Sequence, residues 1–289
     1  MYCFHIICHK LLFICCMVSV TKSDQLAVPS NISRHTPIHS QFLCLPTSEN
    51  YSYGLLPTNR LFQQRYEREL SSFEKSMIDS LPLQYNLRTT YNSCLSLTTI
   101  LQQHTCGACW AFGATGIVAD RLCIAGIANI LPSAQFSVNC DRTCSLDNTR
   151  ECNIGCNGGY LGPALEFTMN HFVTTNSCVP YTNTEQPCTN SCSDGTPFQP
   201  GVNAFSTSGI RHICGEEAIR LAILTSWSVT ARLEVYSDFL EYRETVYVRS
   251  PTSSLKGRHP VTIIGWEGEK DEGGGEKRFW VCQNTGGEG

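Results

Sequence analysis

The chain has 289 residues, a formal net charge of -4 and 18 cysteines. This length is enough for one large domain or two modest ones with a hydrophobic core. Hydrophobic residues make up 42% and charged residues 16% of the sequence, which excludes a wholly disordered chain. The mildly acidic charge lacks the basic surface that nucleic-acid-binding proteins carry, so we expect no nucleic-acid partner.

The amino terminus has the layout of a secretory signal peptide over residues 1–22. Lys10 precedes an apolar run over residues 11–20, and small polar residues suited to cleavage after Thr21 or Ser23 follow. The alternative is a membrane anchor, which needs about 20 apolar residues, more than this run contains. We therefore expect a protein of the secretory pathway, in a lysosome-like vacuole or outside the cell, without membrane contact after signal removal.

Export changes what the cysteines imply. Four of the 18 lie in the predicted signal peptide, and the remaining 14 enter an oxidising compartment, where disulfides form. Sequons for N-glycosylation at Asn31 and Asn50 fit the same compartment.

The segment after the signal peptide differs in composition from the rest of the chain. Residues 24–60 are rich in Ser, Thr, Pro and Asn and are predicted to form loops. Residues 61–80 are charged and predict a helix. The composition changes near Leu81, so we expect an amino-terminal segment over residues 23–80 and a main domain over residues 81–289.

The two parts of the main domain differ in sequence pattern. Residues 109–130 are apolar on nearly all sides and rich in Ala and Gly, which predicts a buried helix. Residues 140–200 hold seven cysteines and predict a loop-rich region joined by disulfides. Beyond residue 202 we expect a helix at 216–224, strands at 228–235, 245–248, 261–266 and 278–281, and a glycine-rich hairpin loop at 267–277.

The most specific motif is Cys106-Gly-Ala-Cys109-Trp110, at the start of the predicted buried helix. A cysteine at a helix amino terminus has a lowered pKa and is a candidate nucleophile. Gln103 lies six residues upstream, where its amide is placed to stabilise an oxyanion. The alternatives, a metal half-site or a redox pair, need a second ligand pair or a small βαβ unit, and the sequence contains neither. We expect no metal and no cofactor.

A nucleophilic cysteine needs a base and a group that orients the base. Among eight histidines, His259 begins a predicted strand and lies 150 residues beyond Cys109. Asn284 follows 25 residues later, and a hairpin would bring it back beside His259. The order of these three residues predicts a Cys–His–Asn arrangement.

These motifs resemble the papain-like cysteine proteases, and within them the cathepsin B branch, over about residues 80–289. The resemblance implies an α+β, papain-like two-domain fold, with a helical domain, a β-barrel-like domain and the active-site cleft between them. It implies a monomeric cysteine-type endopeptidase for peptide or protein substrates, made as a zymogen with the amino-terminal segment as its propeptide. Cys109 would be the nucleophile and His259 the general base and acid. Asn284 would orient the base, and Gln103 would stabilise the oxyanion.

Further residues take roles from the same resemblance. Gly155-Cys-Asn-Gly-Gly159 matches the family's loop that pairs with the substrate backbone, which assigns substrate binding to Gly158 and Gly159. It also implies five disulfides, and leaves Cys214 and Cys282 unassigned. The implied pairs are Cys94–Cys123, Cys106–Cys156, Cys140–Cys188, Cys144–Cys152 and Cys178–Cys192.

The sequence departs from the family in four places. The segment 182–190 contains no histidine, so the occluding loop of cathepsin B is expected to be absent. Arg258 and Pro260 flank His259 where the family has glycine and alanine. Asn284 is followed by Thr-Gly-Gly instead of the family's Ser-Trp-Gly, and the family's closing strands are expected to be missing, which predicts a domain incomplete at its carboxyl end.

These departures predict an impaired enzyme. Without the tryptophan, water would compete for the contact between His259 and Asn284. Strands 261–266 and 278–281 would lose neighbours and expose an apolar edge, so we expect little activity and poor solubility. A second hypothesis is a secreted homologue that binds peptide or protein without cleaving it. A disulfide scaffold is disfavoured, because it needs neither Gln103 nor Trp110.

Overall fold

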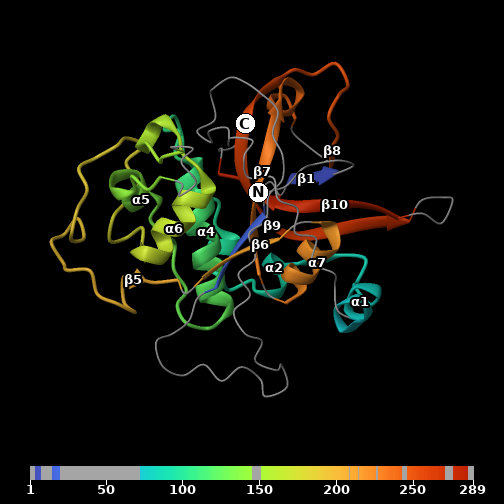
Figure 1. The fold of residues 1–289 in the computed structure, drawn as a ribbon, viewed down its shortest axis with the longest axis horizontal. Coiled ribbons are helices and arrows are strands. Elements are labelled where there is room, and N and C mark those ends of the chain that lie inside the picture. Colours follow the sequence, from blue (N-terminus) through green and yellow to red (C-terminus); the bar gives the residue numbers. More distant parts are fainter. Residues whose placement is uncertain are drawn as a thin grey trace.

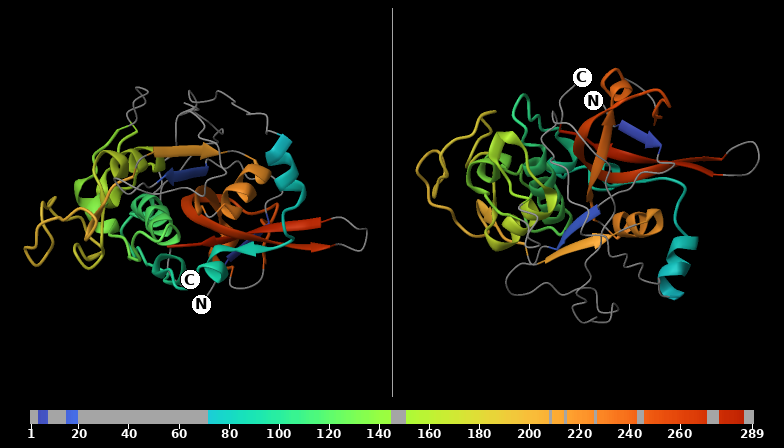
Figure 2. Two further views of the ribbon diagram at one scale, coloured as in Figure 1. Left: turned by 90° about the horizontal axis from the view of Figure 1, so that it is seen from below. Right: turned by 45° about the horizontal axis from the view of Figure 1, so that its top comes forward.

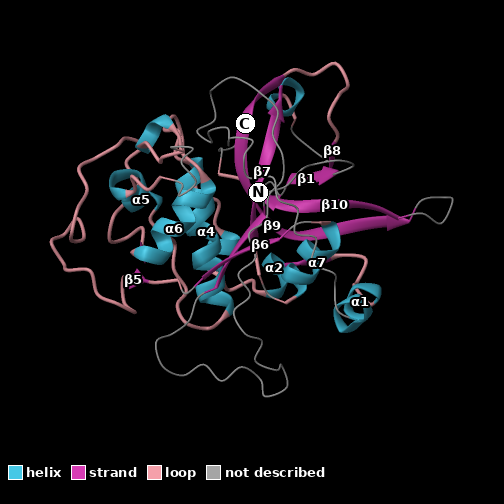
Figure 3. Ribbon diagram, viewed as in Figure 1, coloured by secondary structure: helices cyan, strands magenta, loops and turns pink. Residues whose placement is uncertain are grey.

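The fold combines a helical half and a sheet (Figure 1). The computed structural model describes residues 72–144, 151–207, 209–213, 215–225, 227–242, 246–270 and 276–285, and two short strands nearer the amino terminus. The helices within residues 109–170 gather on one side, and the long strands lie on the other together with the helices of residues 72–79 and 216–224 (Figure 3). The expected α+β class is therefore correct. The two sequons, Cys214 and most of the segment 23–80 lie outside the described residues.

The central helix of the helical half is α4 (Cys109–Ile124). It begins where the sequence predicts, but it ends before residue 130 because Gly126 takes the left-handed φ of +66° that stops a helix. Nearly every side chain of its first three turns is buried, as the apolar pattern predicts. It packs against α5 (Ala134–Cys140) and α6 (Leu161–Asn170). Since α6 lies in the segment predicted as loops, that prediction is wrong there.

Short elements surround these helices. In chain order they are α1 (Ser72–Asp79), β3 (Tyr85–Asn86), α2 (Leu87–Thr90), α3 (Leu95–Thr98), η1 (Gly155–Asn157), β4 (Val173–Thr174) and β5 (Ala204–Phe205). The helix α1 lies inside the predicted helix 61–80, and it packs against α7 (Glu216–Leu224), whose bounds match the prediction. Within the described part of the chain, no helix is both long and apolar enough to cross a membrane.

The sheet is built mainly from the carboxyl-terminal third. Its strands there are β6 (Gly209–Ile213), β7 (Val229–Tyr236), β8 (Val246–Tyr247), β9 (Leu255–Lys270) and β10 (Glu276–Gln283), with η2 (Ser237–Leu240) after β7. The order is β6-β2-β7-β9-β10-β1-β8, where β1 (Phe4–Ile7) and β2 (Cys15–Ser19) come from the amino terminus, and β3 pairs with β9. The described strands form an open sheet whose end strands β6 and β8 are not paired with each other.

Two strands come from the predicted signal peptide. The strand β1 (Phe4–Ile7) lies between β10 and β8, and β2 (Cys15–Ser19) lies between β6 and β7 (blue in Figure 2). Consequently β10 has neighbours on both sides, β9 and β1, and β9 lies between β7 and β10. The expected exposed edge at strands 261–266 and 278–281 is therefore absent from the described sheet.

The strand β9 carries Pro260, which cannot donate a backbone hydrogen bond. Pro260 pairs with Arg232 of β7 on one side. On the other side, the pairing of β10 with β9 reaches only Gln283 opposite Thr262. Pro260 thus lies where β9 has a described partner on one side only, which explains why the strand tolerates a proline.

Candidate active site

Cys109 is the first residue of α4, and its side chain is fully buried. The loop before it is held by the Cys106–Cys156 disulfide and by a 3.0 Å hydrogen bond from the Gly107 amide to the Cys156 carbonyl. Burial raises the pKa of the Cys109 thiol well above its ordinary value, and the backbone N–H groups of Trp110 and Cys109 partly oppose this shift. In this structure the thiol is therefore covered.

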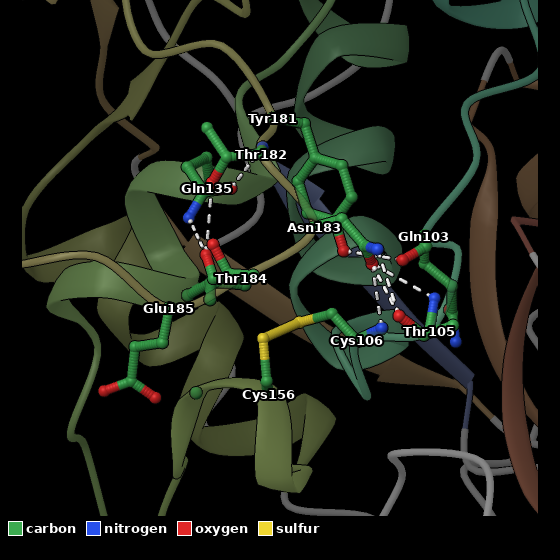
Figure 4. Close-up of a disulfide and its surroundings, with 12 residues drawn as sticks. Gln103, Thr105, Cys106, Gln135, Cys156, Tyr181, Thr182, Asn183, Thr184 and Glu185 are labelled. Atoms are coloured by element: carbon green, nitrogen blue, oxygen red, sulfur yellow. Dashed lines mark hydrogen bonds between the residues drawn. A yellow bond between two sulfur atoms is a disulfide. The ribbon is translucent and has the colours of Figure 1, made fainter.

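Two residues that sequence reasoning missed shape the loop before Cys109 (Figure 4). The Asn183 Oδ1 accepts hydrogen bonds from the backbone N–H groups of Thr105 and Cys106, each at 3.0 Å. The Tyr181 hydroxyl donates to the Gln103 carbonyl at 2.8 Å. Both partners lie 78 residues away in sequence, so no local spacing could have revealed them.

His259 and Asn284 meet as the sequence predicts. The His259 Nε2 lies 2.7 Å from the Asn284 Oδ1. The antiparallel pairing of β9 with β10 brings them together, because it ends with Gln283 opposite Thr262. His259 is 4% exposed and Asn284 is half-buried, so the hydrogen bond between them is partly shielded from water.

The end of β10 is also bound to the chain that leads to Cys109. The backbone N–H of Gln103 donates to the backbone carbonyl of Thr285 at 3.0 Å. The Gln283 Nε2 donates to the carbonyls of Ser96 and Thr99, both at 3.0 Å. Gln103 is therefore bonded to Thr285, the residue that follows Asn284. The contacts of Gln103 and Gln283 join the two halves of the molecule at the candidate site.

The Gln103 side chain is buried, with 8% exposure. Its Oε1 has no hydrogen-bond partner among the described residues. An unsatisfied buried amide is unfavourable, and active sites are one place where such groups persist.

The helix of Cys109 also packs against the strand of His259. A methyl group added at Gly113 would lie 3.1 Å from the Pro260 Cβ and 3.0 Å from the Thr230 Oγ1. Gly113 is one helical turn beyond Cys109. The first turn of α4 therefore lies against the part of β9 that carries His259.

The two glycines assigned to substrate binding need to be glycine in this fold. Gly158 has a φ of +104°, which strains any residue with a side chain. A Cβ at Gly159 would lie 2.5 Å from the Asn153 Oδ1 and 2.7 Å from the Trp110 ring. The Trp110 Nε1 donates to the Gly155 carbonyl at 3.1 Å, so this loop packs against the residue that follows Cys109.

The structure contains the five disulfides that the resemblance implied. They join Cys94–Cys123, Cys106–Cys156, Cys140–Cys188, Cys144–Cys152 and Cys178–Cys192. Cys282 is buried in β10 and belongs to none of them.

The segment 182–190, which lacks histidine, is attached to the helical half. The Thr182 N–H donates to the Gln135 Oε1 at 2.8 Å (Figure 4). Glu185 pairs with Arg142, which follows α5 in the chain. These contacts hold the segment against the end of α5.

Comparisons with known proteins agree with this geometry. Residues 81–289 match the family model "Papain family cysteine protease". The chain is 29% identical over 265 residues to Cathepsin B of Dictyostelium discoideum, covering 84% of this chain and 82% of that protein. It is 30% identical over 247 residues to Cathepsin B-like CP3 of Giardia intestinalis, covering 83% of this chain and 75% of the relative.

Solved structures share the fold. The structure of procathepsin B S9 from Trypanosoma congolense superimposes with a TM-score of 0.60 at 22% identity, over 76% of this chain and 71% of that one. A recombinant stem bromelain precursor superimposes with a TM-score of 0.56 at 23% identity, over 75% and 63%. None of these relatives supports the alternative of a binding protein without activity. The chain belongs to the papain family of cysteine proteases, as a cysteine peptidase with cathepsin B-like relatives.

Proposed function

We propose that this chain is a cysteine-type endopeptidase that hydrolyses peptide bonds through Cys109. The thiolate attacks the scissile carbonyl, and His259 accepts the thiol proton and later donates it to the leaving amine. Asn284 holds the imidazole in one orientation, and the Gln103 side chain stabilises the tetrahedral oxyanion. Gly158 and Gly159 offer backbone groups to an extended substrate.

The observation that carries this proposal is the 2.7 Å contact between the His259 Nε2 and the Asn284 Oδ1. A histidine held through Nε2 presents its other ring nitrogen for proton transfer. The backbone hydrogen bond from Gln103 to Thr285 brings the oxyanion candidate to the same strand end. These contacts support the assignment of a base and an oxyanion donor at the same end of β10.

We propose further that the chain is made as a zymogen, with residues 1–22 as signal peptide and residues 23–80 as propeptide. The family match begins at residue 81, and both superimposed structures are precursors. The full burial of Cys109 fits a form that does not yet admit substrate. The disulfides support an oxidising compartment, either a lysosome-like vacuole or the cell exterior.

The direct test is labelling with an epoxide or vinyl-sulfone probe, which alkylates an activated thiol. The activated protein should be modified at Cys109 by peptide mass spectrometry, and Cys109→Ala should abolish both labelling and turnover of a fluorogenic peptide. Cys282→Ser is the matched control, because Cys282 is a buried cysteine that belongs to none of the five disulfides, and its replacement should leave labelling intact. Modification of Cys282 instead of Cys109 would contradict the assignment.

Processing has its own test. Amino-terminal sequencing of the secreted protein should give a start between about residues 75 and 90. The presence of β1 and β2 in the sheet makes this measurement informative, because the processed form would lack both strands. A fully active protein that still begins before residue 24 would refute the zymogen proposal.

The segment 182–190 motivates the assignment as an endopeptidase. We expect no carboxydipeptidase activity, because the segment holds no histidine that could bind a terminal carboxylate. Efficient sequential release of dipeptides from a peptide with a blocked amino terminus would show that this part of the proposal is wrong.

A further inference from the structure

We propose that Arg258 selects an acidic side chain of the peptide substrate close to the cleaved bond, an inference that rests on the function proposed above. Arg258 directly precedes His259 in β9 and is 5% exposed. Its Nε and Nη2 have no hydrogen-bond partner among the described residues. Buried guanidinium N–H groups without an acceptor are unfavourable, so the Nε and Nη2 of Arg258 mark a place where an acceptor could bind.

The sheet register shows which way this arginine faces. Alternate residues of a strand share a face, so Arg258 and Pro260 lie on the same side of β9. Pro260 lies against Gly113, one turn beyond Cys109 in α4. Pro260, on the same side of β9 as Arg258, therefore packs against the helix that begins with Cys109.

The charges around Arg258 favour the binding of a carboxylate in addition to that of Glu234. Glu234 lies opposite Arg258 in β7, and its Oε2 already accepts a 2.9 Å hydrogen bond from the Tyr236 hydroxyl. The Arg249 guanidinium lies 3.8 Å from the centre of the Tyr236 ring. Burial and Glu234 raise the pKa of Tyr236, while the charges of Arg249 and Arg258 oppose that shift. The guanidinium groups of Arg249 and Arg258 thus both act on Tyr236. Glu234, the carboxylate opposite Arg258, already accepts a hydrogen bond from the Tyr236 hydroxyl.

A substrate that can reach Cys109 can also reach Arg258. Cys109 is 0%, His259 4% and Arg258 5% exposed, so all three are covered alike in this structure. In the proposed mechanism, a substrate that reaches Cys109 and His259 also comes close to Arg258, which directly precedes His259 in β9. An arginine side chain spans about two residues of extended chain, so we expect the acidic residue within about three positions of the cleaved bond. Guanidinium and carboxylate fit each other in a bidentate pair.

The test is a positional-scanning peptide library with blocked termini, cleaved by the secreted, activated protein. At one position the wild type should cleave peptides with Glu or Asp about 10 to 100 times more efficiently, by kcat/KM, than those with Gln or Asn. Arg258→Gln should bring this ratio close to one, and Arg258→Lys should keep part of it. Glu234→Gln should raise the ratio, because it removes the carboxylate that lies opposite Arg258.

Arg278→Gln is the matched control, because Arg278 lies in β10 and pairs with Glu216 of α7, away from this face. It should leave the ratio within about twofold. Equal cleavage of acidic and amide peptides by the wild type overturns the proposal, as does an acidic preference that Arg258→Gln leaves intact. A preference for free carboxyl-terminal carboxylates alone also overturns it. Should Arg258→Gln fail to fold by circular dichroism, Glu234→Gln and Arg258→Lys still decide the question.

The two proposals fail in distinguishable ways. A protein that cleaves no peptide and is not labelled at Cys109 removes the peptidase function, and this inference with it. A protein that is labelled at Cys109 and cleaves acidic and neutral peptides equally keeps the peptidase function and removes only the role of Arg258.

Discussion

The helical half and the sheet half are stabilised by different means. All five disulfides lie between residues 94 and 192, in the helical half and its junction with α3. The sheet half is held by strand pairing and by a core that includes Trp266, Ile263 and Leu233. The proposed nucleophile Cys109 is thus held by a disulfide nearby, whereas the proposed base His259 is held by strand register and by its hydrogen bond with Asn284. The two halves should respond differently to reduction, to pH and to single substitutions.

The largest expected effect is the loss of the disulfide next to the nucleophile. Cys106 and Cys156 close a loop of 50 residues, so replacing both with Ser should lower the free energy of unfolding by about 4 kcal/mol. Replacing Cys144 and Cys152, which are 8 residues apart, should cost about 2.5 kcal/mol. Urea unfolding of the two double variants checks the order. Equal losses would show that chain entropy does not explain how the helical half is stabilised.

A buried carboxyl at the junction of the halves should make stability depend on pH. Burial raises the pKa of Asp120 in α4 to about 6, although the hydroxyls of Ser228 and Ser96 and the charge of Arg88 lower it. The folded state therefore holds this proton more tightly than the unfolded state, whose pKa is near 3.8. The resulting stabilisation is complete below about pH 4 and is lost as pH rises through 6, by about 3 kcal/mol.

Asp120→Asn should remove this part of the pH dependence. Urea unfolding between pH 4 and 7 measures it, with the exposed residue of α1 in Asp79→Asn as the control that keeps the wild-type slope. An unchanged slope in Asp120→Asn would mean that this carboxyl titrates alike in the folded and unfolded chains.

In the sheet half, the orientation of the base should depend on one hydrogen bond. Asn284→Ala leaves the His259 Nε2 without its 2.7 Å partner, and we expect kcat to fall about 10- to 100-fold with KM changed less. Asn190→Ala, at an exposed asparagine of the helical half, should leave kcat near the wild-type value. A parallel loss of probe labelling and melting temperature in Asn284→Ala would indicate a structural role for Asn284 instead.

The smallest effects should come from helix caps, one in each half. The Ser133 Oγ accepts from the Phe136 N–H at the start of α5 and donates to the Val179 carbonyl at 2.6 Å, fully buried. The Asn86 Oδ1 accepts from the Arg88 N–H at the start of α2 in a half-buried setting. We expect Ser133→Ala to cost about 2 kcal/mol and Asn86→Ala about 1 kcal/mol, measured by thermal unfolding. The reverse order would show that burial does not strengthen the cap.

Local patterns predicted the elements that carry the chemistry. The apolar run after Cys109 forms α4, the segment 216–224 forms α7, and the β-branched stretches form β7, β9 and β10. The helix α6 was missed because its sequence, LGPALEFTMN, lies among cysteines and glycines that indicate loops. The strands at the amino terminus were missed because an apolar run after a cation is typical of a signal peptide, and such a run pairs equally well as a strand.

The sequence by itself determined which residue types stand at the site and in what order, because Cys109, His259 and Asn284 occupy motifs that are readable along the chain. The contact between His259 and Asn284 followed from a hairpin, which is a local structure. Only the tertiary structure decided how the site is held. The contacts of Tyr181 and Asn183 with the loop before Cys109, and of Thr285 with Gln103, join segments separated by 77 residues or more. Such contacts depend on how the two halves pack, and no periodicity or spacing in the chain records them.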